Sequence, residues 1–119
     1  MLLKIFTTIM LLALAVPAWA LPPSEEARVE KLLQVLSAKT GLVFIRNGSE
    51  YKLETALGHL RRKYNHARGG LQAAEQFIDE LASHSARSGR PYRVRMPGGN
   101  IVDTGPYLHQ LLQEIDAAD

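Results

Sequence analysis

The sequence predicts an α+β fold in which about four amphipathic helices pack on a small two-stranded antiparallel sheet, after a cleaved signal peptide. Four segments repeat apolar residues at helical spacing, two short segments have the composition of strands, and glycine-containing breaks separate several of them. The expected order is α-β-α-α-β-α. One-sided helices of this kind bury their apolar stripes against each other or against the sheet.

Residues 1–20 have the pattern of a secretory signal peptide. Lys4 supplies a positive charge, residues 5–16 form an apolar run, and the segment ends in an Ala-x-Ala cleavage pattern at Ala20. A run of about 12 residues is too short for a bilayer, which needs ~20. We therefore expect cleavage after Ala20, export to the periplasm or beyond, and no transmembrane segment in the mature chain. Residues 21–119 are expected to form one domain.

The first half of the mature chain predicts a helix, a strand and a second helix. A capping serine and two glutamates favour a helix start, so the first helix is expected over residues 25–38. The apolar residues 42–46 indicate a strand. Asn47-Gly48 follows them and is a strong signal for a tight turn, because both residues tolerate positive φ. Another apolar stripe predicts a helix over residues 53–67.

The second half predicts a helix, a strand and a last helix. Apolar spacing places the third helix over residues 72–85. Residues 92–96 alternate between polar and apolar side chains, which is typical of a half-buried strand with its two arginines on the solvent side. Residues 97–100 read as a turn, and Asp103 or Thr104 is expected to cap the fourth helix.

Composition and charge exclude several classes of function. The chain has 14 basic and 12 acidic residues and a net charge of +2, so without the leader it is close to neutral. That is not the strongly basic balance of a nucleic-acid-binding protein. The chain contains no cysteine, which excludes thiol catalysis, thiolate metal sites and disulfides. Stability must therefore come from the apolar core.

One arc of the helix over residues 53–67 is a candidate anion-binding surface. Beside the apolar stripe it carries His59, Arg62, Lys63 and His66. Arginine offers a planar fork that suits carboxylate or phosphate oxygens. The alternative is an ordinary solvated helix face, because charged faces are normal on surface helices.

A second candidate surface consists of Arg46, Arg93 and Arg95. If the two strands pair, their alternation places all three side chains on one open sheet face, near Tyr51 or Tyr92. That face is a candidate site for an anionic ligand or a partner. The alternative is that these long side chains only cover exposed apolar area with their stems.

These candidates favour a non-catalytic binding or interaction module of the cell envelope, with an envelope protein, a glycan or an anionic headgroup as its partner. The chain has neither the His-Glu-x-x-His motif of metalloproteases nor the Gly-x-Ser-x-Gly motif of hydrolases. We expect no catalytic residue, metal site or cofactor. The alternative is a cell-envelope hydrolase that uses His59 with a serine or a carboxylate.

Four ordered motifs also resemble a known family. They are Phe-Ile-Arg-Asn-Gly-Ser-Glu-Tyr at residues 44–51, His-Leu-Arg-Arg-Lys at 59–63, Ala-Glu-Gln-Phe-Ile-Asp-Glu-Leu-Ala-Ser at 74–83, and Ser-Gly-Arg-Pro-Tyr at 88–92. Together they are similar to the YfeK-like family of small exported bacterial proteins, a domain of unknown function. The resemblance covers nearly all of the mature chain. It implies export and the small α+β fold, and it implies no reaction.

Overall fold

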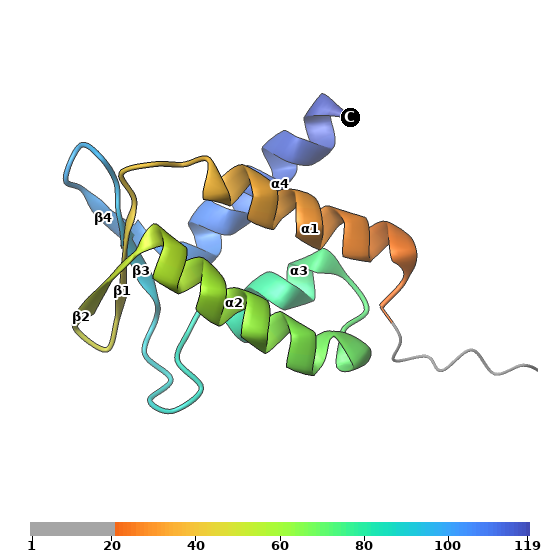
Figure 1. The fold of residues 1–119 in the computed structure, drawn as a ribbon, viewed down its shortest axis with the longest axis horizontal. Coiled ribbons are helices and arrows are strands. Elements are labelled where there is room, and N and C mark those ends of the chain that lie inside the picture. The colour runs from red at the N-terminus through yellow and green to blue at the C-terminus, as the bar shows by residue number, and fades with distance from the viewer. Residues whose placement is uncertain (1–20) are drawn as a thin grey trace, which may run out of the picture.

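The computed structural model describes residues 21–119, and the expected signal peptide lies outside the described residues. The predicted α+β class is confirmed, with the helices on one side of a sheet (Figure 1). No helix in residues 21–119 is long and apolar enough to cross a membrane. The elements in chain order are α1 (Pro23–Ser37), β1 (Val43–Arg46), β2 (Ser49–Lys52), α2 (Leu53–Ala67), η1 (Arg68–Gly70), α3 (Ala74–Gln76), η2 (Phe77–Ala82), β3 (Arg93–Arg95), β4 (Ile101–Asp103) and α4 (Thr104–Ala118).

The sheet has four strands in the order β2-β1-β3-β4, so the predicted two-stranded sheet is wrong. Each predicted strand is one arm of a hairpin, and the two hairpins meet where β1 pairs with β3. The predicted turn at Asn47 and Gly48 joins β1 to β2, with φ of 50° and 79°. Positive φ at both central residues is what a tight hairpin turn requires. All neighbouring strands are antiparallel.

The three long helices follow the predicted apolar spacing. In α1 the buried residues are Val29, Leu32, Leu33 and Leu36, which are also the residues of its apolar stripe. α2 and α4 bury their stripes in the same way, and the three helices share one hydrophobic core with β1 and β3. Among residues 21–119 this core contains 20 buried hydrophobic residues. The chain has no cysteine, so packing of this core takes the place of a disulfide.

The third helix differs from its prediction in both bounds and type. It begins at Ala74, changes to a π-helix over Phe77–Ala82, and ends before the predicted residue 85. Ala73 offers no side-chain cap, and the backbone N–H of Ala74 instead donates to Glu25 Oε1 of α1 at 3.0 Å. At the other end, Ser83 Oγ donates to the carbonyl of Ile78 at 2.6 Å. The contact with Glu25 is tertiary and the contact of Ser83 is a polar side-chain bond at the helix end, so apolar spacing alone predicts neither.

An arginine joins three of the helices. The Arg28 guanidinium lies 2.7 Å from Glu25, 2.6 Å from Glu75 in α3 and 2.7 Å from Asp116 in α4. Hydrogen bonds to Asp116 and Glu75 raise the pKa of Arg28 further above its already high ordinary value. The cluster fixes α1 against α3 and α4, which both pack against it.

Candidate functional site

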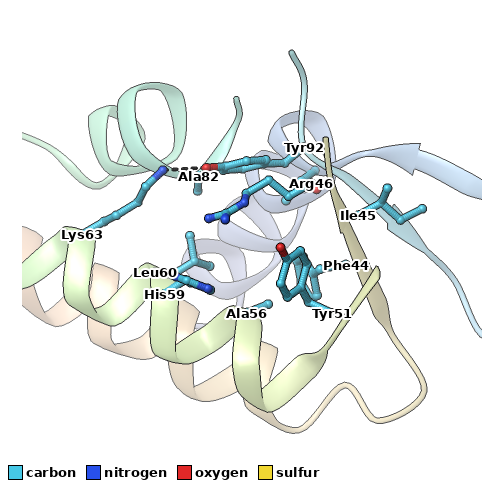
Figure 2. Close-up of a pocket in the computed structure, with 11 residues that line it drawn as sticks. Phe44, Ile45, Arg46, Tyr51, Ala56, His59, Leu60, Lys63, Ala82 and Tyr92 are labelled. Atoms are coloured by element: carbon cyan, nitrogen blue, oxygen red, sulfur yellow. Dashed lines mark hydrogen bonds between the residues drawn. The ribbon is translucent and has the colours of Figure 1, made fainter. Parts of the chain in front are cut away.

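A pocket of about 40 Å³ opens between the sheet and α2 (Figure 2). Its apolar wall comes from the sheet, from α2 and from the end of the π-helix. Five of the eight sequence-predicted site residues surround it: Arg46, Tyr51, His59, Lys63 and Tyr92. The full lining is Phe44, Ile45, Arg46, Tyr51, Ala56, His59, Leu60, Lys63, Ala82, Tyr92 and Thr104.

Strand register decides which sheet side chains reach this pocket. Phe44 pairs with Tyr51 on β2 and with Val94 on β3, and directly paired residues share a face of the sheet. Both Phe44 and Val94 are buried against the helices. Arg46 and Tyr92 each lie two residues from one of this pair, so they share the helix-facing side. The sequence therefore brings a guanidinium and two phenols to one side through alternation alone.

Arg93 and Arg95 lie on the opposite face, so the expectation that they share a face with Arg46 is wrong. They pair with Ile45 and Val43, whose side chains alternate with those of the helix-facing residues. Both arginines are paired with carboxylates. Arg93 lies 3.4 Å from Asp103 on β4, and Arg95 forms an ion pair with Glu50 on β2.

His59 lines the pocket, while Arg62 stays outside the lining. Burial lowers the pKa of His59 below its ordinary value, and the positive charges of Arg46, Arg62 and Lys63 lower it further. The Arg62 guanidinium lies 3.2 Å from His59 Nδ1 and can only donate, so Nδ1 accepts. The proton of the neutral ring is therefore on Nε2, which makes Nε2–H the one donor of the imidazole.

Lys63 already has partners inside the protein. Its ammonium donates to Tyr92 Oη at 2.8 Å and to the carbonyl of Leu81 at 3.0 Å (Figure 2 draws the bond to Tyr92). Leu81 lies in the last turn of the π-helix, where a backbone carbonyl has no partner further along the helix. Because Tyr92 Oη accepts from Lys63, its own proton is available to a ligand.

Arg46 and Lys63 both line the pocket without an anionic partner among residues 21–119, but Arg46 also lacks the hydrogen bonds that Lys63 makes. Its guanidinium lies 5.4 Å from the centre of the Tyr51 ring, a cation–π arrangement. Within residues 21–119 it has no hydrogen bond or ion pair, and no carboxylate lines the pocket. The side chain is half-buried, so solvent compensates its charge only in part.

Thr104 is a lining residue that the sequence analysis did not select as a site residue. It is 1% exposed, and its Oγ1 has no hydrogen-bond partner in the described part of the chain. Sequence reasoning treated it as a helix cap, but the N-cap of α4 is Asp103 and makes no side-chain cap bond. A threonine that begins a helix gives no sign that its hydroxyl will be buried. The apolar lining was missed because those residues read only as core.

The contacts of the histidines decide which groups are placed for acid–base chemistry. Among residues 21–119, the hydrogen bond of His59 is to Arg62, and no serine or carboxylate bonds to its ring. In the described part of the chain, His109 contacts Asp79 at 2.6 Å, and neither residue lines the pocket. Residues 21–119 also contain no group of three or more side chains placed to hold a metal ion.

The fold and the pocket thus define a small α+β domain with a basic and aromatic cavity. The chain belongs to the DUF5329 family, a family of unknown function whose pattern matches residues 23–116. It is 43% identical over 90 residues to the uncharacterized protein YfeK of Salmonella typhimurium (strain LT2), with 75% of each chain covered. The family resemblance read from the four motifs is confirmed. No solved structure matches the chain at a significant level.

Proposed function

We propose that this protein is a non-catalytic binding module of the bacterial cell envelope, and that the pocket between the sheet and α2 binds an anionic group of its ligand. The observation that carries the proposal is the half-buried Arg46, which has no anionic partner in residues 21–119. A cation held partly away from water is unfavourable unless an opposite charge compensates it. A bound anion supplies that charge.

The surrounding charges support an anion rather than a cation as the ligand group. Lys63 is in the lining and Arg62 lies beside it, while the carboxylates near the sheet are paired with arginines on its other face. A pocket with one sign of charge and apolar walls concentrates the field that attracts the opposite charge. Tyr51 and Tyr92 add flat surfaces and hydroxyls that orient a ligand.

Absence of catalysis is supported by the state of His59. A general base is most effective when its pKa lies near the working pH and when a second group orients its ring. Here neighbouring cations lower the pKa of His59, and its Nδ1 accepts a bond from a guanidinium rather than donating to a carboxylate. The hydrolase alternative needs the reverse arrangement.

Export is the second part of the proposal and rests on the pattern of residues 1–20. A short apolar run that ends in Ala-x-Ala is the physical signature that signal peptidase reads. The test is to express the full chain in a Gram-negative bacterium, fractionate the cells and measure the intact mass. Periplasmic recovery of a chain starting at Leu21 supports export. Cytoplasmic recovery of the uncleaved chain contradicts it.

Anion binding is tested by NMR titration of the purified protein with acetate, inorganic phosphate and sulfate. We expect saturable shifts at Ala56, Ala82 and the Arg46 side chain with at least one of these anions. Arg46→Gln removes the charge and keeps most of the length of the side chain. The affinity for the anion, obtained from the titration of the shifts, should fall at least about tenfold. Arg93→Gln is the matched control, since it removes an arginine from the adjacent strand on the opposite face.

Two results would count against a binding pocket. In the first, none of the three anions shifts a lining residue. In the second, Arg46→Gln and Arg93→Gln reduce the shifts equally, which means that the anions respond to net charge and not to the pocket.

A further inference from the structure

We infer that the protein has a second binding site, a groove beside the edge strand β4, which takes an extended apolar peptide as an added strand. The groove lies between the β3–β4 hairpin, α4 and the segment that joins α1 to β1. It shares no lining residue with the pocket between the sheet and α2, so this inference goes beyond the proposed function. Three features lead to it: free backbone groups on β4, the size of the groove, and the balance of its charges.

The outer side of β4 has backbone groups without a partner strand. Just before β4, the carbonyl of Asn100 accepts from the N–H of Met96 on the β3 side at 2.8 Å. Backbone groups alternate in direction along a strand, so those of Val102 face β3 and those of Ile101 face outward. β4 ends the sheet order, and no strand within residues 21–119 pairs with its outer side. The N–H and C=O of Ile101 are therefore available to one residue of an added strand.

The side chains on the two edges of the sheet also differ. The other edge strand, β2, exposes Glu50 and Lys52, and charged side chains of this kind protect an edge against strand addition. On β4 the exposed carboxylate of Asp103 is paired with Arg93 of the inner strand. Ile101 is 45% exposed and is the one exposed large hydrophobic side chain among residues 21–119. An apolar side chain on an unpaired edge favours pairing with another strand.

The groove has the volume of a ligand site. It measures about 560 Å³, within the ~300–1,000 Å³ that is common for such sites. Val102 pairs with the buried Val94, so its side chain lies on the helix-facing side, where it lines the groove. The apolar lining also includes Met96, Tyr107 and Leu111. In an added strand, the residue opposite Ile101 lies on the open face, and its neighbour opposite Val102 points into the groove.

The charges around the groove favour a ligand without a strong net charge. Lys39 and Glu114 line it, and neither has an ion pair within residues 21–119. One cation and one unpaired carboxylate attract neither anions nor cations strongly, in contrast to the pocket beside α2, which no carboxylate lines. A peptide backbone is neutral and supplies both donors and acceptors, as strand addition requires. An extended peptide therefore matches the edge, the groove and the charge together.

Isothermal titration calorimetry on the purified protein tests peptide binding. The probe is acetyl-Ser-Leu-Val-Leu-Ser-amide, which places leucines on one side of a strand and a β-branched residue on the other. The matched control is acetyl-Ser-Asn-Val-Asn-Ser-amide, which keeps the backbone and removes the apolar side chains. We expect the leucine peptide to bind at least about tenfold more tightly than the asparagine peptide. Equal affinities would contradict an apolar groove.

N-methylated peptides test the backbone pairing without changing the protein. In an added antiparallel strand, only every second residue turns its N–H toward β4. One peptide carries the methyl group on the nitrogen of the central valine, and the other carries it on the nitrogen of the following leucine. Their affinities should differ at least about tenfold, whichever of the two residues lies opposite Ile101. Equal affinities of the methylated peptides would overturn pairing with β4.

Two variants of α4 test the groove. Gln110 is exposed and lines it, so Gln110→Trp should fill part of the space and weaken peptide binding at least about tenfold. Gln113 is also exposed on α4 and does not line the groove, so Gln113→Trp is the matched control. Thermal unfolding checks that both variants are folded. Equal peptide affinities in the two variants would overturn the assignment of the groove.

The remaining outcomes separate this site from other occupants and from the anion pocket. Arg46→Gln should bind the leucine peptide as the wild type does, because Arg46 does not line the groove. If no peptide binds and light scattering shows a dimer that Gln110→Trp dissociates, a second copy occupies the edge and the peptide is overturned. If no peptide binds to a monomeric protein, this inference is overturned, and the anion pocket is judged by its own titration.

Discussion

The two faces of the four-stranded sheet use arginine in opposite ways. On the open face Arg93 forms an ion pair with Asp103 on the neighbouring strand β4, and Arg95 forms one with Glu50 on β2, across β1. On the helix-facing side Arg46 lies over the ring of Tyr51 without an anion among residues 21–119. The difference follows from one step in the alternation of β1, because Arg46 and Ile45 point to opposite faces. An arginine with paired charge is structural or solvated, whereas an arginine left unpaired and half-buried is available to a ligand.

The largest expected effect is a difference in stability between truncations on the two faces of the sheet. Phe44 is 7% exposed on the helix-facing side, and Phe44→Ala should lower the free energy of unfolding by ~3–5 kcal/mol through lost burial and an enlarged cavity. That is a large share of the ~5–15 kcal/mol typical of a domain. Ile101 is 45% exposed on β4, and Ile101→Ala should cost less than about 0.5 kcal/mol. Urea unfolding measures both.

Equal destabilisation in the two variants would contradict this account of the sheet. It would mean that the open face is covered in solution, since an exposed isoleucine gains little from folding unless another surface buries it.

The second effect concerns an arginine that is paired and partly buried, namely Arg28. Removing it in Arg28→Gln leaves Glu25, Glu75 and Asp116 close together without their shared cation. We expect a loss of about 1–3 kcal/mol at pH 7, measured by urea unfolding. Arg61→Gln breaks the exposed pair with Glu30 and is the matched control, expected to cost less than about 1 kcal/mol.

The same cluster predicts a pH dependence with a defined sign. The hydrogen bond from Arg28 lowers the pKa of Glu75 below its ordinary value of 4.5. The folded state therefore gains stability above that pH and loses it as the pH falls through the lower pKa of the folded protein. The difference between wild type and Arg28→Gln should be largest at neutral pH and should shrink below pH 4.5. A difference that stays constant to pH 2 would show that Arg28 acts through packing alone.

The sequence predicts the three long helices well because their stability comes from a local pattern. Apolar spacing identified the buried stripe of α1, and Asn47-Gly48 identified the turn because the backbone there needs positive φ. The missed strand β2 reads Ser-Glu-Tyr-Lys, with only Tyr51 half-buried. Such a strand has almost no apolar pattern of its own. Its pairing with β1 stabilises it, and that partner is not visible in a local window.

The sequence predicted only part of the candidate site, for a related reason. Residues 43–46 read Val-Phe-Ile-Arg, three apolar residues in a row, so no alternation shows which of them faces the core. Arg46 was therefore grouped with Arg93 and Arg95, and the register separates them. The sequence grouped His59, Arg62, Lys63 and His66 on one arc of α2, because residues three and four apart on a helix share a face. Of these four, His59 and Lys63 line the pocket.

The third prediction concerns the charge around the helix-facing pocket and is a modest shift. Burial and three nearby cations hold the pKa of His59 below 6.5. Arg62→Gln removes one of these charges and the bond to Nδ1, so the pKa of His59 should rise toward its ordinary value. Saturating acetate should raise it in the wild type, because a bound anion favours the imidazolium. NMR titration of the ring protons measures both changes.

The lowered pKa of His59 also predicts how the free energy of unfolding changes with pH. The unfolded chain binds the proton of His59 more readily than the folded protein does, so the free energy of unfolding should fall as the pH is lowered through 6.5. Acetate should reduce that fall if it binds beside His59. A His59 pKa that ignores acetate while other lining residues shift would place the anion away from the imidazole.

The smallest expected effect belongs to the open face. Arg93→Gln and Arg95→Gln should each change the free energy of unfolding by less than about 1 kcal/mol. In ion pairs at the surface, the loss of hydration and of side-chain entropy offsets most of the electrostatic attraction. The double variant should leave anion binding at the pocket unchanged, since neither side chain lines it. Urea unfolding at low and high salt measures the first effect, and acetate titration measures the second. Loss of binding in the double variant would show that net charge attracts the anion from a distance. The arginines of both faces would then contribute to anion binding.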